Sequence, residues 1–139
     1  MFNKSIICTT ANRLRLQGYT RPQAFIIAWT LAKGRDIGVS GVTHENRQIA
    51  IDRLTRYPAE QVRFEPVREP ENRYDRNAVA VMVSVNGSEW FKIGYVPAYT
   101  APLVFAVLNI GSCVKTQFKA IVGGWADGIN YGLRLNLSL

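Results

Sequence analysis

The sequence contains only two cysteines and one histidine among its 139 residues. Cys8 and Cys113 lie far apart in a chain without secretion signals, so we interpret both as reduced, semi-buried apolar residues. No cysteines are paired in the spacing of zinc ligands, and His44 alone cannot complete the usual ligand sets. The sequence therefore predicts no disulfide framework and no zinc site, and we expect no cofactor.

Long hydrophobic runs and the common catalytic motifs are also missing. No apolar stretch reaches the roughly 18 residues that a membrane span needs, and the N-terminus has no cleavage pattern of a signal peptide. There is no glycine-rich phosphate loop followed by Lys-Ser or Lys-Thr, and no nucleophile elbow near the one histidine. We therefore expect a cytoplasmic protein that binds no membrane and does not hydrolyse nucleotides by itself.

One enzyme class stays open as an alternative, a metal-dependent nuclease. Its ligands would be four acids of one segment, whose oxygens are of the kind that divalent cations prefer: Glu65, Glu69, Glu71 and Asp75. Each of them is interleaved with arginines, which favours ion pairs at the surface over a metal site. We therefore predict a protein without catalytic residues.

Acidic residues are scarce relative to basic ones. Seventeen Lys and Arg against ten Asp and Glu give a net charge of +7. Six of the bases but only one of the acids fall in residues 1–36, so the surplus is concentrated there. A positive surplus favours acidic partners, nucleic acid first. The alternative is that these bases form the solvated face of ordinary helices.

Residues 1–36 have the pattern of two helices. The first is predicted over roughly residues 4–17 and the second over residues 24–33, after Thr20 and Gln23 in the spacing of a capping box. Apolar residues cover nearly the whole circumference of the second helix, so we expect it to pack on more than one side. This helical leader is therefore also a candidate docking surface for a protein partner or a second copy of the chain.

Residues 37–139 change to a rhythm of short strands. Asn86-Gly87 is a hairpin turn signal, because both residue types accept positive φ. Six short strands with two inserted helices favour a small, partly closed barrel, which hides strand edges in few residues. The predicted fold class is therefore α+β, a mostly antiparallel OB-like barrel preceded by a helical pair. We expect helices over residues 45–54 (with Ile49, Ile51 and Leu54 as its apolar contacts) and 100–111, and strands over residues 36–43, 61–67, 77–85, 89–97, 113–122 and 131–139.

Aromatic residues accompany glycines, amides and bases in the predicted loops. Tyr74 lies in a charged loop, Tyr95 follows a strand glycine, Trp125 follows two glycines, and His44 follows the first strand. Aromatic rings on loops with cations between them suit stacking on unpaired bases, while the cations hold phosphates. The alternative is that any of these rings only closes the barrel.

The order of the motifs resembles the HIRAN domain over residues 37–139. GVTHENRQIAI, REPENRYDRNAVAV, KIGYVPAYTA, IVGG and YGL follow one another in the order and spacing of that family. The most specific part is REPENRYDRNAVAV followed by IGYVP. The helical leader resembles those of small stand-alone bacterial and phage members.

The resemblance implies a modified OB-like barrel with a noncatalytic role in DNA metabolism. Larger eukaryotic members bind single-stranded DNA, notably a free 3′ end, beside an ATPase whose motifs are absent here. In that family an aspartate accepts a hydrogen bond from the terminal sugar hydroxyl, and this role falls on Asp75. The resemblance places Tyr74 as a pocket wall, Asn72 as a polar contact, and Tyr95, His44 and Trp125 as the remaining rings.

Two positions depart from the best-known eukaryotic member. Thr43, next to His44, stands where that member has an arginine, and Ala98 stands where it has a lysine. Each lost cationic contact could reduce affinity by about 1 kcal/mol or more. The candidates to replace these phosphate contacts are Arg47, Arg73, Arg76 and Lys92. A purely structural alternative also stays open, in which Asp75 and Asn77 only satisfy backbone amides of a turn.

Overall fold

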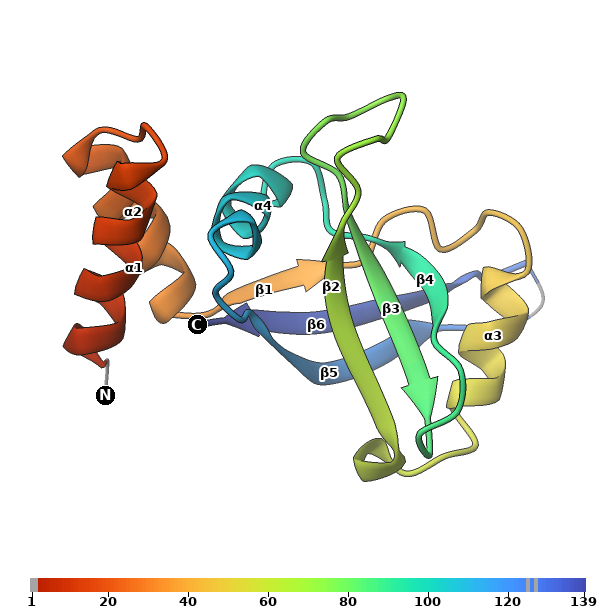
Figure 1. Cartoon of the computed structure of the whole chain (residues 1–139). Coiled ribbons are helices and arrows are strands. Elements are labelled where there is room, and N and C mark those ends of the chain that lie inside the picture. Colours follow the sequence, from red (N-terminus) through yellow and green to blue (C-terminus); the bar gives the residue numbers. More distant parts are fainter. Residues whose placement is uncertain (1–2, 125, 127) are drawn as a thin grey trace.

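The computed structural model describes residues 3–124, 126 and 128–139. Figure 1 shows two helices on one side of a strand-rich domain, with a third helix on the opposite side of the strands. The predicted α+β class, the antiparallel strands, the two inserted helices and the N-terminal pair are confirmed. No helix of the described part has the length and apolar character to cross a membrane.

The N-terminal pair consists of α1 (Lys4–Leu16) and α2 (Arg21–Ala32). The predicted capping box starts α2. Thr20 Oγ1 accepts a hydrogen bond from the Gln23 amide at 3.3 Å, and Gln23 Oε1 accepts one from the Thr20 amide at 3.0 Å. Two amides that α2 could not satisfy internally are thus paired, which fixes where the helix begins.

Helix α2 buries only one face. Ala24, Ala28 and Leu31 are fully buried, and Leu31 belongs to the main core of the domain. Phe25 and Ile26, by contrast, are exposed on the other side, and so is Trp29. Within the described residues, α2 therefore buries the face that carries Ala24, Ala28 and Leu31 and leaves the opposite face exposed, so the expectation that it packs on more than one side is not met.

The strands form two antiparallel three-stranded sheets. The first has the order β1 (Arg35–Gly38), β6 (Tyr131–Ser138) and β5 (Lys115–Gly123). The second has the order β2 (Val62–Arg68), β3 (Val79–Val85) and β4 (Phe91–Tyr95). The inserted helices are α3 (Arg47–Leu54) and α4 (Ala101–Asn109), and a short 3₁₀ helix (Ala59–Gln61) precedes β2. The predicted hairpin turn between β3 and β4 is confirmed, with positive φ at Asn86 and Gly87.

Two consecutive residues after β1 join the sheets. The Val39 amide donates to the Leu133 carbonyl of β6 at 2.9 Å. Ser40 then exchanges two hydrogen bonds of 2.8 Å with Tyr95 of β4. A Cβ at Gly94 would lie 2.5 Å from the Ser40 carbonyl oxygen, so this approach requires glycine.

The opposite edges, β2 and β5, are not paired with each other in the described part of the chain. The rings of Phe64 and Phe118 lie across that seam, with centroids 6.2 Å apart. The six strands therefore form a partly closed arrangement of two joined sheets and not a closed barrel.

Two expectations about burial are wrong. Ile51 and Leu54 are buried as predicted, but Ile49 is 55% exposed. Residues two apart lie on opposite sides of a helix, so Ile49 cannot share the buried face of Ile51. Cys8 and Cys113 are unpaired, but both are exposed and not semi-buried. The domain boundary between residues 36 and 37 stays a prediction.

Helix α2 is expected to be part of the folding unit. Leu31 is 0% exposed, so Leu31→Ala should lower the free energy of unfolding by about 2–5 kcal/mol through the cavity that it leaves. Leu16→Ala is the matched control on α1, because Leu16 is 85% exposed and its loss should change stability by less than about 0.5 kcal/mol. Urea denaturation measures both. Equal effects of the two substitutions would show that α2 is not packed into the core.

Candidate nucleic-acid interface

A cavity of about 470 Å³ lies where the loop after β1 meets the loop between β2 and β3. In Figure 1 the loop between β2 and β3 projects beyond the upper ends of these strands, and the loop after β1 runs from the end of β1 to α3. Six residues singled out from the sequence line this cavity: His44, Arg47, Asn72, Tyr74, Asp75 and Tyr95. Ala98, one of the two positions that depart from the eukaryotic pattern, lines it too.

Tyr95 is held in place by an ion pair beneath it. Its hydroxyl donates to Glu69 Oε1 and accepts from Lys92 Nζ, both at 2.9 Å, and Lys92 Nζ lies 2.5 Å from Glu69 Oε2. The Lys92 ammonium lies 5.0 Å from the centre of the Tyr95 ring, and the Arg47 guanidinium carbon lies 5.7 Å from it. The ring therefore contacts two cations, each attracted by its π electrons.

The titration of Glu69 and Lys92 reflects the same contacts. Burial acts to raise the pKa of Glu69, but hydrogen bonds from Lys92, Asn72 and Tyr95 outweigh it and hold that pKa below its ordinary value. Hydrogen bonds to Glu69 and Tyr95 raise the pKa of Lys92 above its ordinary value, against the effect of burial. The pair is therefore fully charged at neutral pH, and Lys92 is engaged with Glu69 and does not line the cavity.

Arg47 lies at the start of α3 and is only 8% exposed, although it lines the cavity. Its Nη1 donates to the Gly41 carbonyl at 2.8 Å, and its Nη2 lies 4.0 Å from the exposed carboxylate of Glu45. Its Nε is buried without a hydrogen-bond partner among the described residues. Arg47 thus holds the loop after β1 and brings one incompletely paired cation to the cavity.

Asn72 organises the loop between β2 and β3. Its Oδ1 accepts from the amides of Tyr74 at 2.9 Å and Asp75 at 3.1 Å, and its Nδ2 donates to Glu69 Oε1 at 3.1 Å. These bonds shape the turn and tie it to the ion pair under Tyr95. The Asn72 side chain was expected as a polar contact, but these bonds occupy it within the loop.

The two carboxylate oxygens of Asp75 differ in their contacts. Its Oδ1 accepts from the Asn77 amide at 2.9 Å, as the structural alternative expected. Within the described residues, Oδ2 makes no hydrogen bond or ion pair. Tyr74, its neighbour, is 96% exposed and so stands free of the protein core. The turn role of Asp75 therefore leaves one carboxylate oxygen available to a ligand.

The remaining sequence-predicted residues that the structure describes do not line the cavity. Arg73 and Arg76 are exposed on the same loop, and Thr43 is exposed beside His44. Trp125 lies outside the described residues. The four acids weighed as nuclease ligands form no metal site there, since no three His, Cys, Asp or Glu side chains of the described part come together.

The role of Glu69 could not be seen in the sequence. The arginines interleaved with the acids favoured ion pairs at the surface, but Arg68, next to Glu69, instead donates to Asn109 Oδ1 and lies over the Phe105 ring at 5.9 Å. Glu69 pairs with Lys92, which is far away in sequence and becomes a neighbour only through the pairing of β2, β3 and β4. The one part of this network that is local in sequence is the contact between Lys92 and Tyr95, three residues apart at β4.

The ion pair under Tyr95 can be tested by its effect on titration. Glu69→Gln is expected to lower the pKa of Lys92 toward its ordinary value, because the carboxylate that stabilises the ammonium is lost. NMR titration of the Lys92 side chain measures this change. Glu65→Gln removes an exposed acid of β2, the strand that ends just before Glu69, and should leave the Lys92 pKa where it is. The assignment fails if Lys92 titrates identically in the wild-type chain and in Glu69→Gln.

Comparison with known proteins agrees with this geometry. The family model of the HIRAN domain matches residues 42–125, which is more than half of the chain and includes the loop between β2 and β3 and most of the loop after β1. No curated protein and no solved structure matches the chain. HIRAN domains are DNA-binding modules and are generally noncatalytic on their own. By this match and by the loops that carry it, the chain belongs to the HIRAN domain family.

Proposed function

We propose that this HIRAN domain binds single-stranded DNA without catalysis and holds a free 3′ end in the cavity between its two loops. The observation that carries the proposal is the convergence of six residues, chosen from the sequence alone, on one cavity of about 470 Å³. They come from three separate segments of the chain, so their meeting is a property of the fold and not of one motif.

Asp75 is the residue that recognises the end. Its Oδ1 is fixed by the Asn77 amide, so the direction of Oδ2 is set before any ligand arrives. A terminal sugar hydroxyl donating to this oxygen makes a charge-assisted hydrogen bond, one of the stronger kinds. A 3′-phosphate in the same place would bring its own negative charge against the carboxylate and would be rejected.

The rings and the cation supply the rest of the affinity. Tyr74 and His44 are exposed at the cavity and can enclose a base, while Tyr95 is already oriented by Lys92 and Glu69. One stacked base contributes about 1–3 kcal/mol. Arg47 is the cation that lines the cavity, so it takes the phosphate contact that Thr43 and Ala98 cannot provide. Arg73 and Arg76, which are exposed on the loop between β2 and β3, add electrostatic attraction to the phosphates of the DNA.

Recognition of the end is tested by fluorescence polarisation with two labelled oligonucleotides of the same sequence. The one with a free 3′-hydroxyl should bind roughly tenfold more tightly than its 3′-phosphorylated form, since one charge-assisted bond is lost and a repulsion is added. Asp75→Asn should reduce this ratio, because the amide oxygen can still hold the Asn77 amide while the carboxylate is gone.

Glu71→Gln is the matched control for this experiment. Glu71 is an exposed acid of the same loop that does not line the cavity. Removing it should leave the preference for the 3′-hydroxyl unchanged. Equal affinity for both oligonucleotides, with Asp75→Asn behaving like the wild-type chain, would remove end recognition from the proposal while leaving DNA binding itself in place.

A second candidate function is protein interaction through the helical leader. The observation that favours it is the exposed apolar group on α2, formed by Phe25, Ile26 and Trp29, with Ile26 63% exposed. Adjacent exposed apolar side chains of this kind mark interaction surfaces. Here the surface would pair with a second copy of the chain, whose α2 offers the same residues.

Light scattering after size exclusion tests that pairing over a range of concentrations. The wild-type chain is expected to form dimers as concentration rises, and Ile26→Asp should keep it monomeric because a charge cannot be buried in the pair. Ile49→Asp, at an exposed isoleucine of α3, should leave the dimer intact. A wild-type chain that is monomeric at every concentration would exclude a second copy as the partner.

A further inference from the structure

A second recess lies between α3 and β4, next to the cavity already described. Its volume is about 440 Å³, and we call it the α3–β4 groove. Three of its large apolar side chains (Ile49, Tyr57 and Phe91) are exposed, as is Trp90 beside them. The groove is lined by Asn46, Ile49, Ala50, Arg53, Leu54, Tyr57, Val85 and Phe91.

The groove and the cavity are continuous along two elements. Asn46 lines the groove while Arg47, the next residue, lines the cavity. On β4, Phe91 lines the groove and Tyr95 lines the cavity, and Figure 1 shows α3 beside this strand. A ligand leaving the cavity along α3 therefore enters the groove directly. Arg47 and Arg53 are six residues apart, which is about 9 Å along the helix, a distance that two adjacent nucleotides of a strand can span.

The junction between the two sites offers positive charge. Asn46 makes no side-chain hydrogen bond to cap α3. The Arg47 amide donates to the His44 carbonyl at 3.2 Å, but no side chain caps the next two amides, those of Gln48 and Ile49, within the described residues. The buried guanidinium of Arg47 lies at the same place, with Nε unpartnered among the described residues. Together these groups favour an anion between the cavity and the groove.

The groove itself combines rings with a cation. Tyr57 and Phe91 present aromatic surface. Arg53 of α3 lines the groove with them and has no ion-pair partner in the described part of the chain. Asp52, the acid next to Arg53 in the sequence, is engaged elsewhere. Its Oδ1 accepts from the Tyr131 hydroxyl at 2.6 Å, and its Oδ2 lies 3.4 Å from Arg56. Exposed rings beside an unpaired arginine suit bases and phosphates of a single strand.

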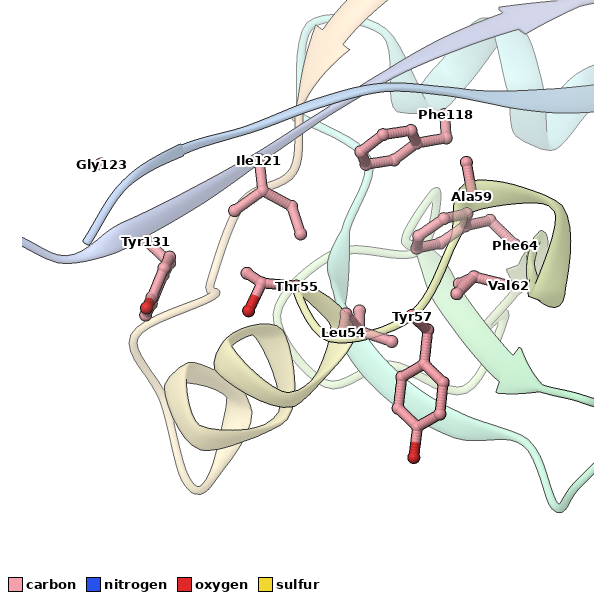
Figure 2. Close-up of a pocket in the computed structure, with 10 residues that line it drawn as sticks. All are labelled: Leu54, Thr55, Tyr57, Ala59, Val62, Phe64, Phe118, Ile121, Gly123 and Tyr131. Atoms are coloured by element: carbon pink, nitrogen blue, oxygen red, sulfur yellow. The ribbon is translucent and has the colours of Figure 1, made fainter. Parts of the chain in front are cut away.

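The neighbouring pocket on the other side of Tyr57 has a different character. It lies in the seam between β2 and β5, has a volume of about 340 Å³, and is walled by Phe64, Phe118 and Ile121. Figure 2 shows the Tyr57 ring directed away from Phe118 and Ile121. No lysine or arginine lines this pocket. The seam therefore lacks the charge that a DNA strand needs, and the α3–β4 groove has it.

We infer that the α3–β4 groove carries the nucleotides that precede the 3′-terminal one, so that the strand runs from the cavity along α3. Tyr57 and Phe91 stack on bases, and Arg53 holds a phosphate. The inference rests on the proposed function, because the cavity is where the strand ends. It adds Arg53, Tyr57 and Phe91, which lie outside the two loops, as the residues that determine how long a strand the domain recognises.

Oligonucleotide length separates the two sites. Fluorescence polarisation compares a 5′-labelled thymidine mononucleotide with a dodecanucleotide, each with a free 3′-hydroxyl. The dodecanucleotide should bind more tightly, and Arg53→Gln or Tyr57→Ala should weaken it by roughly tenfold while leaving the mononucleotide, which fills only the cavity, unchanged. Arg53→Gln should also reduce the slope of log affinity against log salt by about 0.7, the value for one phosphate of a single strand.

Arg56→Gln and Tyr57→Phe are the matched controls. Arg56 is exposed near the same end of α3 but does not line the groove, so its loss should cost far less than the loss of Arg53. Tyr57→Phe keeps the ring and should bind like the wild-type chain, which separates stacking from misfolding. Equal losses from Arg53→Gln and Arg56→Gln, or equal affinity of the wild-type chain for both lengths, would overturn the inference that the groove binds nucleotides. A wild-type chain that binds neither the mononucleotide nor the dodecanucleotide would instead overturn the proposed function.

Discussion

The pair of backbone hydrogen bonds between Ser40 and Tyr95 is the constraint on which the candidate site depends. These two bonds of 2.8 Å link the end of the first sheet to β4 of the second, and they need a glycine at position 94 to let the chains approach. They place the loop that carries His44 and Arg47 opposite the loop that carries Asp75. Without this junction the two loops would belong to separate sheets, and the cavity would have only one wall.

A polar network then fixes the side chains that the junction brings together. Glu69 connects the loop residue Asn72 with Lys92 and Tyr95 on β4, so one carboxylate orients both walls of the cavity. An ion pair this near the surface contributes little stability. Its value is geometric, since a ring and a turn that are already oriented lose less freedom when a ligand binds. The hydrogen bond from Arg47 to the Gly41 carbonyl has the same effect, because it fixes both this side chain and the loop after β1 at the cavity.

The distribution of charge assigns different tasks to the two ends of the molecule. The basic N-terminal helices stand on the opposite side of the strands from α3 in Figure 1, away from the proposed groove. Their charge can attract DNA over a distance but cannot contact a strand held along α3. Contacts at the site must come from residues such as Arg47 and Arg53, in a part of the sequence that is nearly balanced in charge. Net charge alone would therefore point away from the proposed site.

The sequence by itself determined the local structure and the motif. The capping box at Thr20, the turn at Asn86 and the Tyr74-Asp75 pair are set by hydrogen bonds and backbone preferences among neighbouring residues, and these can be seen in a single sequence. Only the tertiary structure decided that Glu69 pairs with Lys92, that Arg47 is buried at the cavity and that Ile49 opens onto a groove. Those outcomes depend on pairing between strands far apart in the chain, for which local residue patterns carry no signal.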